Sequence, residues 1–192
     1  MGKRDSRTVA ATKRRITDGL FEIMRDDPIE RITVREVCGR AGITRSTFYT
    51  HFSSVYDVRD QCEAEISERV EEVLFPEVLA ALAPGGRRGC ARTARCIEEA
   101  LGDHFGHLAV LLNGADPSFV ERARLAAMGV VCAHVGIERM SERQALVFYG
   151  TSSMLLGMYA RWLASDRDMP LEELVATARS AVLRGPAKAM LG

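Results

Sequence analysis

The sequence lacks several patterns that would assign it to a well-defined class of protein. Its 192 residues contain no apolar run of 18 residues, so no transmembrane helix is predicted. The start, MGKRDSRTVAATKRR, is basic but lacks the apolar segment of a secretion signal, and we expect a cytoplasmic protein with no membrane partner. The five cysteines are scattered and form no C-x-x-C pair, which indicates neither a disulfide framework nor a zinc knuckle.

Motifs for catalysis are also absent. There is no G-x-S-x-G, no P-loop and no G-x-G-x-x-G after a strand, and PGGRRG lacks the Lys-Ser/Thr pair of a phosphate-binding loop. His104 and His107 have a spacing that can share a metal ion, but no carboxylate or thiolate lies at ligand spacing beside them. We therefore predict no enzyme, no cofactor and no metal site.

The sequence does contain helical periodicity along nearly its whole length, without the alternation of a half-buried strand or an internal repeat. This pattern predicts an all-α protein. The expected helices cover about 6–26, 33–42, 44–52, 54–82 with a kink at Pro76, 90–101, 103–112, 117–134, 141–164 and 170–183, with a loop at 83–89.

Residues 33–52 read as two short helices joined by a glycine turn. Thr33 and Glu36 have the spacing of a capping box, and Gly42 is a stop signal for the first helix. In the second helix Phe48 and Phe52 share one face, which leaves the polar side chains exposed. A helix-turn-helix places such a second helix in the major groove of DNA. On spacing alone, a solvated surface helix is the alternative.

The charge distribution favours the DNA-binding interpretation. Residues 1–52 hold eleven basic and seven acidic residues, whereas the remainder carries a compensating negative excess in a chain of zero net charge. An excess of positive charge at one end is expected when that end meets a polyanion, although uneven solvated surfaces produce the same asymmetry. The basic residues before Ile16 fit either a disordered tail or an arm that contacts DNA.

The segment TVREVCGRAGITRSTFYTHFSSVYDV, Thr33–Val58, resembles the signature of the TetR/AcrR family of transcriptional regulators. The resemblance implies a homodimeric repressor with a DNA-binding domain at 1–53 and a helical domain at 54–192 that binds a small-molecule effector and the second subunit. Val55 departs from the lysine common in the family, which puts one phosphate contact in doubt. The predicted contacts with operator DNA fall on Thr33, Arg35, Thr44, Arg45, Ser46, Thr47, Tyr49, Thr50 and His51.

The sequence of the C-terminal part indicates a family less strongly. LLNGADPSF and GTSSMLLGMYARWLASDRDMPLEELV resemble the C-terminal domain of regulators related to the dihydroxyacetone kinase activator. Since that subgroup works with a protein partner, a helical co-regulator that binds a protein and has weak affinity for DNA is the alternative function.

Two sets of C-terminal residues are candidates for binding. Soft and aromatic side chains on several helices could line an effector pocket or simply form core. These are Cys62, Ile66, Phe105, Leu108, Tyr149, Met154 and Met158. Small and apolar residues on the last two helices could form a four-helix dimer interface or an intramolecular core. These are Leu146, Gly150, Leu155, Gly157, Trp162, Leu174, Val175, Ala178 and Val182.

Overall fold

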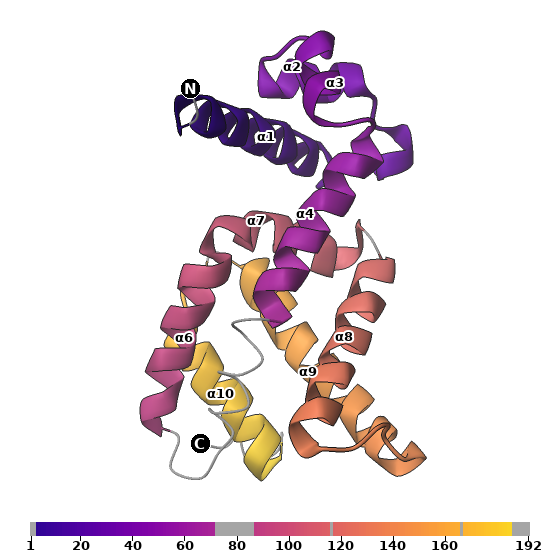
Figure 1. The fold of residues 1–192 in the computed structure, drawn as a ribbon. Coiled ribbons are helices and arrows are strands. Elements are labelled where there is room, and N and C mark those ends of the chain that lie inside the picture. The colour runs from indigo at the N-terminus through magenta and orange to yellow at the C-terminus, as the bar shows by residue number, and fades with distance from the viewer. Residues whose placement is uncertain (1–2, 72–86, 116, 166, 186–192) are drawn as a thin grey trace. The chain divides into compact units, whose positions relative to one another are not determined.

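The structure is a computed structural model that describes residues 3–71, 87–115, 117–165 and 167–185 (Figure 1). Every regular element in these ranges is a helix, which confirms the predicted all-α class. Within the same ranges, no helix is both long and apolar enough to cross a membrane. Internal contacts divide the chain into two compact units, Met1–Glu65 and Ile66–Gly192.

The N-terminal unit contains three complete helices, a short 3-10 turn and most of a fourth helix. They are α1 (Lys3–Ile23), η1 (Ile29–Arg31), α2 (Val34–Ala41), α3 (Arg45–His51) and α4 (Val55–Arg69), whose last residues belong to the second unit. The core of this unit forms where α1 packs on α2 and α2 on α3. Apolar side chains from these elements and the turns between them fill it, with Ile16, Leu20, Ile32, Val37, Phe48 and Phe52 buried and Ile43 half-buried.

The boundary between the compact units differs from the predicted one at 53/54. It lies twelve residues later, at Glu65/Ile66. The reason is that α4 begins as part of the N-terminal core, where Val55, Val58 and Cys62 are buried. The first part of α4 therefore packs with the helices that precede it in the sequence.

The C-terminal unit is a set of helices connected by short turns. It contains α6 (Arg87–Leu101), η3 (Gly102–His104), α7 (Phe105–Val110), η4 (Leu111–Ala115), α8 (Pro117–Val135), α9 (Glu142–Leu163) and α10 (Leu171–Arg184). α6 packs along α10, and α9 contacts α7, α8 and α10 (Figure 1). Apolar stripes on several helices thus meet in one interior.

Most helix ends follow from local signals in the sequence. Ser141 caps α9, because its hydroxyl accepts a hydrogen bond from the backbone N–H of Gln144 and the Gln144 side chain completes a capping box. The predicted helix over 103–112 is instead divided into η3, α7 and η4, and η4 is kinked at Gly114, whose φ is 102°. α6 begins at Arg87, three residues earlier than expected, so the predicted loop does not extend to Gly89. The predicted kink at Pro76 lies outside the described residues.

Candidate DNA-binding site and candidate ligand cavity

The first helix of the predicted pair begins with the expected capping box. The Thr33 hydroxyl accepts a hydrogen bond from the backbone N–H of Glu36 at 3.3 Å, and the Glu36 carboxylate accepts one from the Thr33 N–H at 2.8 Å. The Thr33 hydroxyl also donates to the Glu36 carboxylate at 2.6 Å, and this bond, followed by the one from the Thr33 N–H, lowers the pKa of Glu36 from its usual value. The box fixes where α2 starts, and therefore the direction in which it enters the turn.

The turn between α2 and α3 is held by a side chain from α1. Gly42 adopts the left-handed conformation, with φ 62° and ψ 43°, which only glycine reaches without strain. The Arg15 guanidinium donates from Nη2 to the carbonyl oxygens of Ala41 and Gly42, the latter at 3.1 Å. A Cβ atom on Gly42 would lie 3.1 Å from the same nitrogen. Arg15 therefore locks the corner that sets the angle between the two helices, a role that sequence reasoning missed.

Two buried aromatic side chains, Phe48 and Phe52, hold α3 against the core of the unit. Phe48 is fully buried and Phe52 is 4% exposed, and their ring centroids lie 6.0 Å apart. Thr44 caps the helix, since its hydroxyl accepts from the Thr47 N–H at 3.1 Å. Tyr49 is 51% exposed and stands edge-on to Phe48. The buried rings hold the helix rigid while its other faces point to solvent.

Seven of the nine predicted DNA-contacting residues are exposed, and Thr47 and His51 are half-buried. Part of the hydrogen-bonding capacity is already used inside the helix, because the Thr50 hydroxyl donates to the Ser46 carbonyl at 3.0 Å. Arg35 and Arg45 are exposed and form no ion pair with the described residues. These two guanidinium groups are the available cations of the α2–α3 surface. The exposed set is Thr33, Arg35, Thr44, Arg45, Ser46, Tyr49 and Thr50.

The start of α4 is stabilised by local hydrogen bonds to Asp57. Its carboxylate accepts from the Ser53 backbone N–H at 2.7 Å and from Gln61 Nε2 at 2.8 Å. These bonds, the Ser53 backbone one foremost, lower the pKa of Asp57. Val55, which stands where the family commonly has lysine, is 6% exposed and belongs to the core.

Lys13, one of the basic residues before Ile16 that could have formed an arm, instead contacts α4. Its Nζ donates to Gln61 Oε1 at 3.1 Å and lies 5.3 Å from the centroid of the Phe52 ring. α1 is helical from Lys3, so Lys13 is part of a regular helix and is bound to α4. Lys13 therefore contributes to the contact between α1 and α4 and does not belong to a free arm.

The C-terminal unit encloses a cavity of about 340 Å³, within the size range of small-molecule sites. Its wall is formed by α6, α7, α8, α9, α10, the end of α4 and the two residues that follow it, and is almost entirely apolar. Three predicted pocket residues, Ile66, Phe105 and Leu108, line it. The remaining four do not, since Cys62 belongs to the N-terminal unit and Tyr149, Met154 and Met158 lie elsewhere on α9.

Most of the predicted dimer residues on the last two helices are inside the single chain. Trp162 is 8% exposed, Leu174 and Val175 are each 4% exposed and Ala178 is 5% exposed. Leu155 and Val182 line the cavity together with Trp162, Val175 and Ala178. The side chains of these residues meet other helices of the same unit, which is the arrangement that the intramolecular alternative expects.

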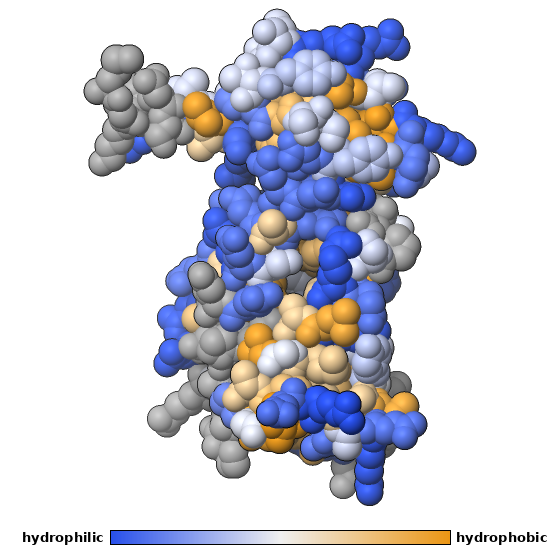
Figure 2. All heavy atoms as spheres, turned by 45° about the vertical axis from the view of Figure 1, so that its right-hand side comes forward, coloured by the Kyte–Doolittle hydropathy of each residue, from blue (hydrophilic) through white to orange (hydrophobic). Residues whose placement is uncertain are grey.

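α9 has two opposite faces. Phe148, Ser152, Leu155, Tyr159 and Trp162 follow one another at helical spacing and line the cavity. The opposite face carries the rest of the predicted dimer set, with Leu146 70% exposed and with Gly150 and Gly157 open to solvent. Figure 2 looks toward the side of the unit that carries α8 and α9, and hydrophobic side chains gather on its surface there. The spacing of residues 148, 152, 155, 159 and 162 is the signal that could have identified the cavity face.

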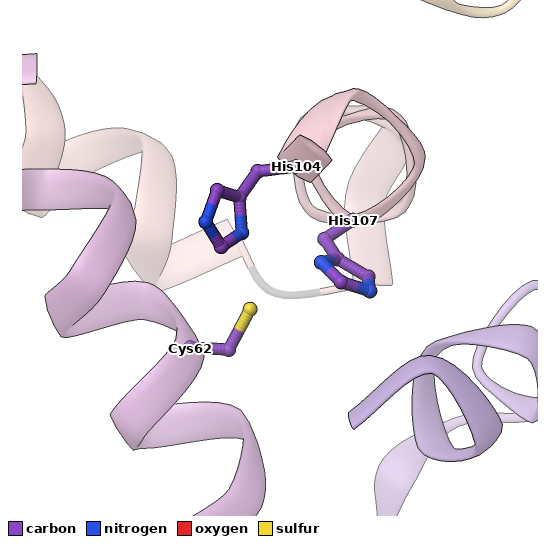
Figure 3. Close-up of side chains that lie close together, drawn as sticks. All are labelled: Cys62, His104 and His107. Atoms are coloured by element: carbon purple, nitrogen blue, oxygen red, sulfur yellow. The ribbon is translucent and has the colours of Figure 1, made fainter. Parts of the chain in front are cut away.

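The two histidines singled out in the sequence project from η3 and α7. Their ring centroids are 5.7 Å apart, and His107 is buried (Figure 3). Each already interacts with other parts of the chain. Cys62, on α4, is also buried, and burial raises the pKa of its thiol to about 12, so it remains protonated at neutral pH.

Comparison with known proteins agrees with this geometry. Residues 16–59 match the model of the bacterial regulatory proteins of the tetR family, which makes the N-terminal unit a domain of that type. No curated protein matches the chain. A TetR transcriptional regulator from Streptococcus agalactiae 2603V is 22% identical, with a TM-score of 0.55 over 93% of this chain and 97% of that one. A tetR-family transcriptional regulator from Streptomyces coelicolor is 16% identical, with a TM-score of 0.59 over 100% of this chain and 84% of that one. The whole chain therefore has the fold of these regulators.

Proposed function

We propose that this protein is a DNA-binding transcriptional regulator of the TetR type, most simply a repressor that acts inside the cell. The observation that carries the proposal is the short polar helix α3, displayed on two buried phenylalanines after a locked glycine corner. This is the arrangement in which a recognition helix presents its N-terminal residues to base edges. The match of residues 16–59 to the tetR-family model supports it independently.

Arg45 is the residue best suited to read a base. It is the first residue of α3, it is exposed, and it has no ion-pair partner among the described residues. A guanidinium at that place can donate two hydrogen bonds to guanine O6 and N7, which discriminates by about 1–3 kcal/mol. Thr33, Tyr49 and His51 suit the phosphates on either side, because a hydroxyl, a phenol and an imidazole can each donate to phosphate oxygen.

A repressor of this kind binds DNA as a two-fold dimer, so that two recognition helices reach major grooves about 34–36 Å apart. The exposed face of α9, with Leu146, Gly150 and Gly157, supplies the proposed contact between subunits. Small residues allow two helices to approach closely, and exposed leucine and valine side chains supply apolar area. Because the predicted α10 residues are buried within the chain, α9 is the principal candidate.

The proposed effector site is the cavity of the C-terminal unit. α4 begins shortly after α3 in the sequence, and its last turn places Ile66 and Ser67 in the cavity wall. In the same turn, Arg69 donates a hydrogen bond to the Ala100 carbonyl at 3.2 Å. A ligand that moves the end of this helix can therefore bias the position of its start. A coupling of about 1–3 kcal/mol would weaken operator binding by roughly 5- to 150-fold.

A co-regulator that works through a protein partner is the second candidate. It is favoured by the similarity of GTSSMLLGMYARWLASDRDMPLEELV to regulators related to the dihydroxyacetone kinase activator. On this alternative, the surface of α3 would not read base sequence. Binding to DNA would then be weak and independent of sequence.

The deciding experiment is selection of bound sites from random duplex DNA with the full chain. We expect a palindromic site, and we expect Arg45→Ala to lose base preference at one position in each half-site. Arg25→Ala, which removes the same charge from the exposed turn after α1, should keep the selected site unchanged. Equal enrichment of all four bases by the wild type would contradict the proposal.

The salt dependence of binding to the selected site distinguishes the two candidates further. A dimer that contacts about eight phosphates should show a log-log slope of affinity against salt near −7. A co-regulator without an operator should show no sequence-specific complex at any salt concentration.

A further inference from the structure

The wall of the cavity restricts the chemistry of any molecule that binds inside it. Aromatic rings come from α7, α8 and α9, with Phe105 and Trp162 packed edge to face at 5.5 Å. The Trp162 indole N–H is not available to a ligand, since it donates to the Met169 carbonyl at 2.8 Å. Trp162 therefore presents only its apolar surface to the cavity.

The charged groups of the wall are largely occupied. Arg124 donates to Glu121 and to Ser153, each at 3.2 Å, and its guanidinium stacks over Tyr149 at 5.0 Å from the ring centroid. Arg179 also has a partner within the chain. Glu71 is exposed. Among the described residues Arg124 Nε is buried without a hydrogen-bond partner, but the guanidinium already pairs with Glu121. A ligand anion would have to compete with Glu121 for it, and burying any charge among the apolar side chains would be costly.

Tyr159 supplies the one aromatic hydroxyl among the described wall residues. It lines the cavity, and its hydroxyl makes no hydrogen bond with the described residues. Burial, with a smaller contribution from Cys90, raises the pKa of the phenol to about 12. The hydroxyl thus stays protonated at neutral pH and can both donate and accept a hydrogen bond.

From this wall we infer that the cavity takes an uncharged, largely apolar ring compound carrying one hydroxyl or carbonyl group, which pairs with the hydroxyl of Tyr159. The inference rests on the proposed function in one respect, namely that such a molecule would be the effector. The recognition itself depends only on the cavity. It can therefore be tested without DNA.

The test uses N-phenyl-1-naphthylamine, an uncharged fluorescent probe, bound to the full chain and displaced by three molecules with one ring system. We expect naphthalene to displace the probe and 2-naphthol to do so about three- to tenfold more tightly, which corresponds to one net hydrogen bond. 2-Naphthalenesulfonate should be at least tenfold weaker than naphthalene, because its charge would be buried in an apolar wall whose arginines already have partners within the chain.

Two matched variants locate the hydrogen bond. Tyr159→Phe should remove the preference for 2-naphthol over naphthalene and leave naphthalene binding within about twofold. Tyr149→Phe removes a hydroxyl from the same helix but outside the cavity wall, where it donates to Glu121 at 3.0 Å, and should leave the preference intact.

The outcomes separate this inference from the proposed function. Sulfonate binding as tight as that of naphthalene, a preference that survives Tyr159→Phe, or no probe binding at all would overturn the ligand class, whatever the protein does on DNA. If the preference follows Tyr159 but 2-naphthol leaves DNA binding unchanged, the ligand class holds and the effector role fails.

Discussion

Asp57 stabilises the start of α4 in its charged form. Because its hydrogen bonds to Ser53 and Gln61 lower its pKa in the folded state, the group favours folding above its ordinary pKa of 3.8. That contribution disappears as the pH falls through the lowered folded value. We expect Asp57→Asn to reduce thermal stability at pH 7 and the loss to shrink progressively below about pH 4.

The measurement is thermal unfolding of wild type and Asp57→Asn from pH 7 to pH 2.5, followed by circular dichroism. Asp60→Asn is the matched control, since Asp60 is an exposed acid on the same helix whose only partner among the described residues is the neighbouring Arg59, in an ion pair at the surface. A difference between wild type and Asp57→Asn that stayed constant across this range would exclude the linkage.

Individual residues of the DNA-binding surface could be foreseen from spacing, because local rules determine them. Phe48 and Phe52 must share a face four residues apart, and Thr33 and Glu36 must form a capping box at a helix start. Arg15 and Lys13 could not be foreseen in the same way. Each acts across 26 or more residues of sequence, and only the packing of α1 brings it to its partner.

At the scale of elements, Arg15 joins α1 to the corner between α2 and α3. We expect Arg15→Ala to lower the affinity for operator more than the affinity for nonspecific DNA, because the helix pair loses the fixed angle that base reading requires. The loss of these hydrogen bonds, one of them to a half-buried carbonyl, should cost about 1–3 kcal/mol of stability.

Arg14→Ala provides the comparison for this variant. Arg14 is adjacent on α1, is exposed and pairs with Asp18 at 3.9 Å, so its removal should change stability by less than about 0.5 kcal/mol. The readouts are urea unfolding and fluorescence anisotropy with specific and random duplexes. Equal effects of the two substitutions would mean that only the loss of charge matters.

α9 shows where sequence reasoning about elements reached its limit. The periodicity identified a long helix with apolar residues on more than one side, and the structure bears out its bounds to within one residue. Periodicity does not say which side meets another helix of the same chain and which is exposed. In the structure, the aromatic face of α9 lines the cavity that α6, α7, α8 and α10 also surround. The face that carries Gly150 and Gly157 is exposed to solvent.

For the whole molecule, the open face of α9 makes a prediction about assembly. Leu146 is 70% exposed in the single chain, so Leu146→Glu should leave the folded monomer stable. At a two-fold interface the substitution places two glutamates in an apolar contact, and we expect the dimer to dissociate. Since both recognition helices must bind together, operator affinity should fall by at least 100-fold, although each α3 is unchanged.

Light scattering of the purified chain gives the mass, and operator binding is measured on the same samples. Leu125→Glu is the matched control, because Leu125 is also an exposed leucine of the C-terminal unit, 48% exposed, but lies on α8. Dissociation by Leu125→Glu with no effect of Leu146→Glu would move the interface to α8. A monomeric wild type that still binds a palindromic site with high affinity would contradict the two-fold arrangement, because one recognition helix would then suffice for the whole site.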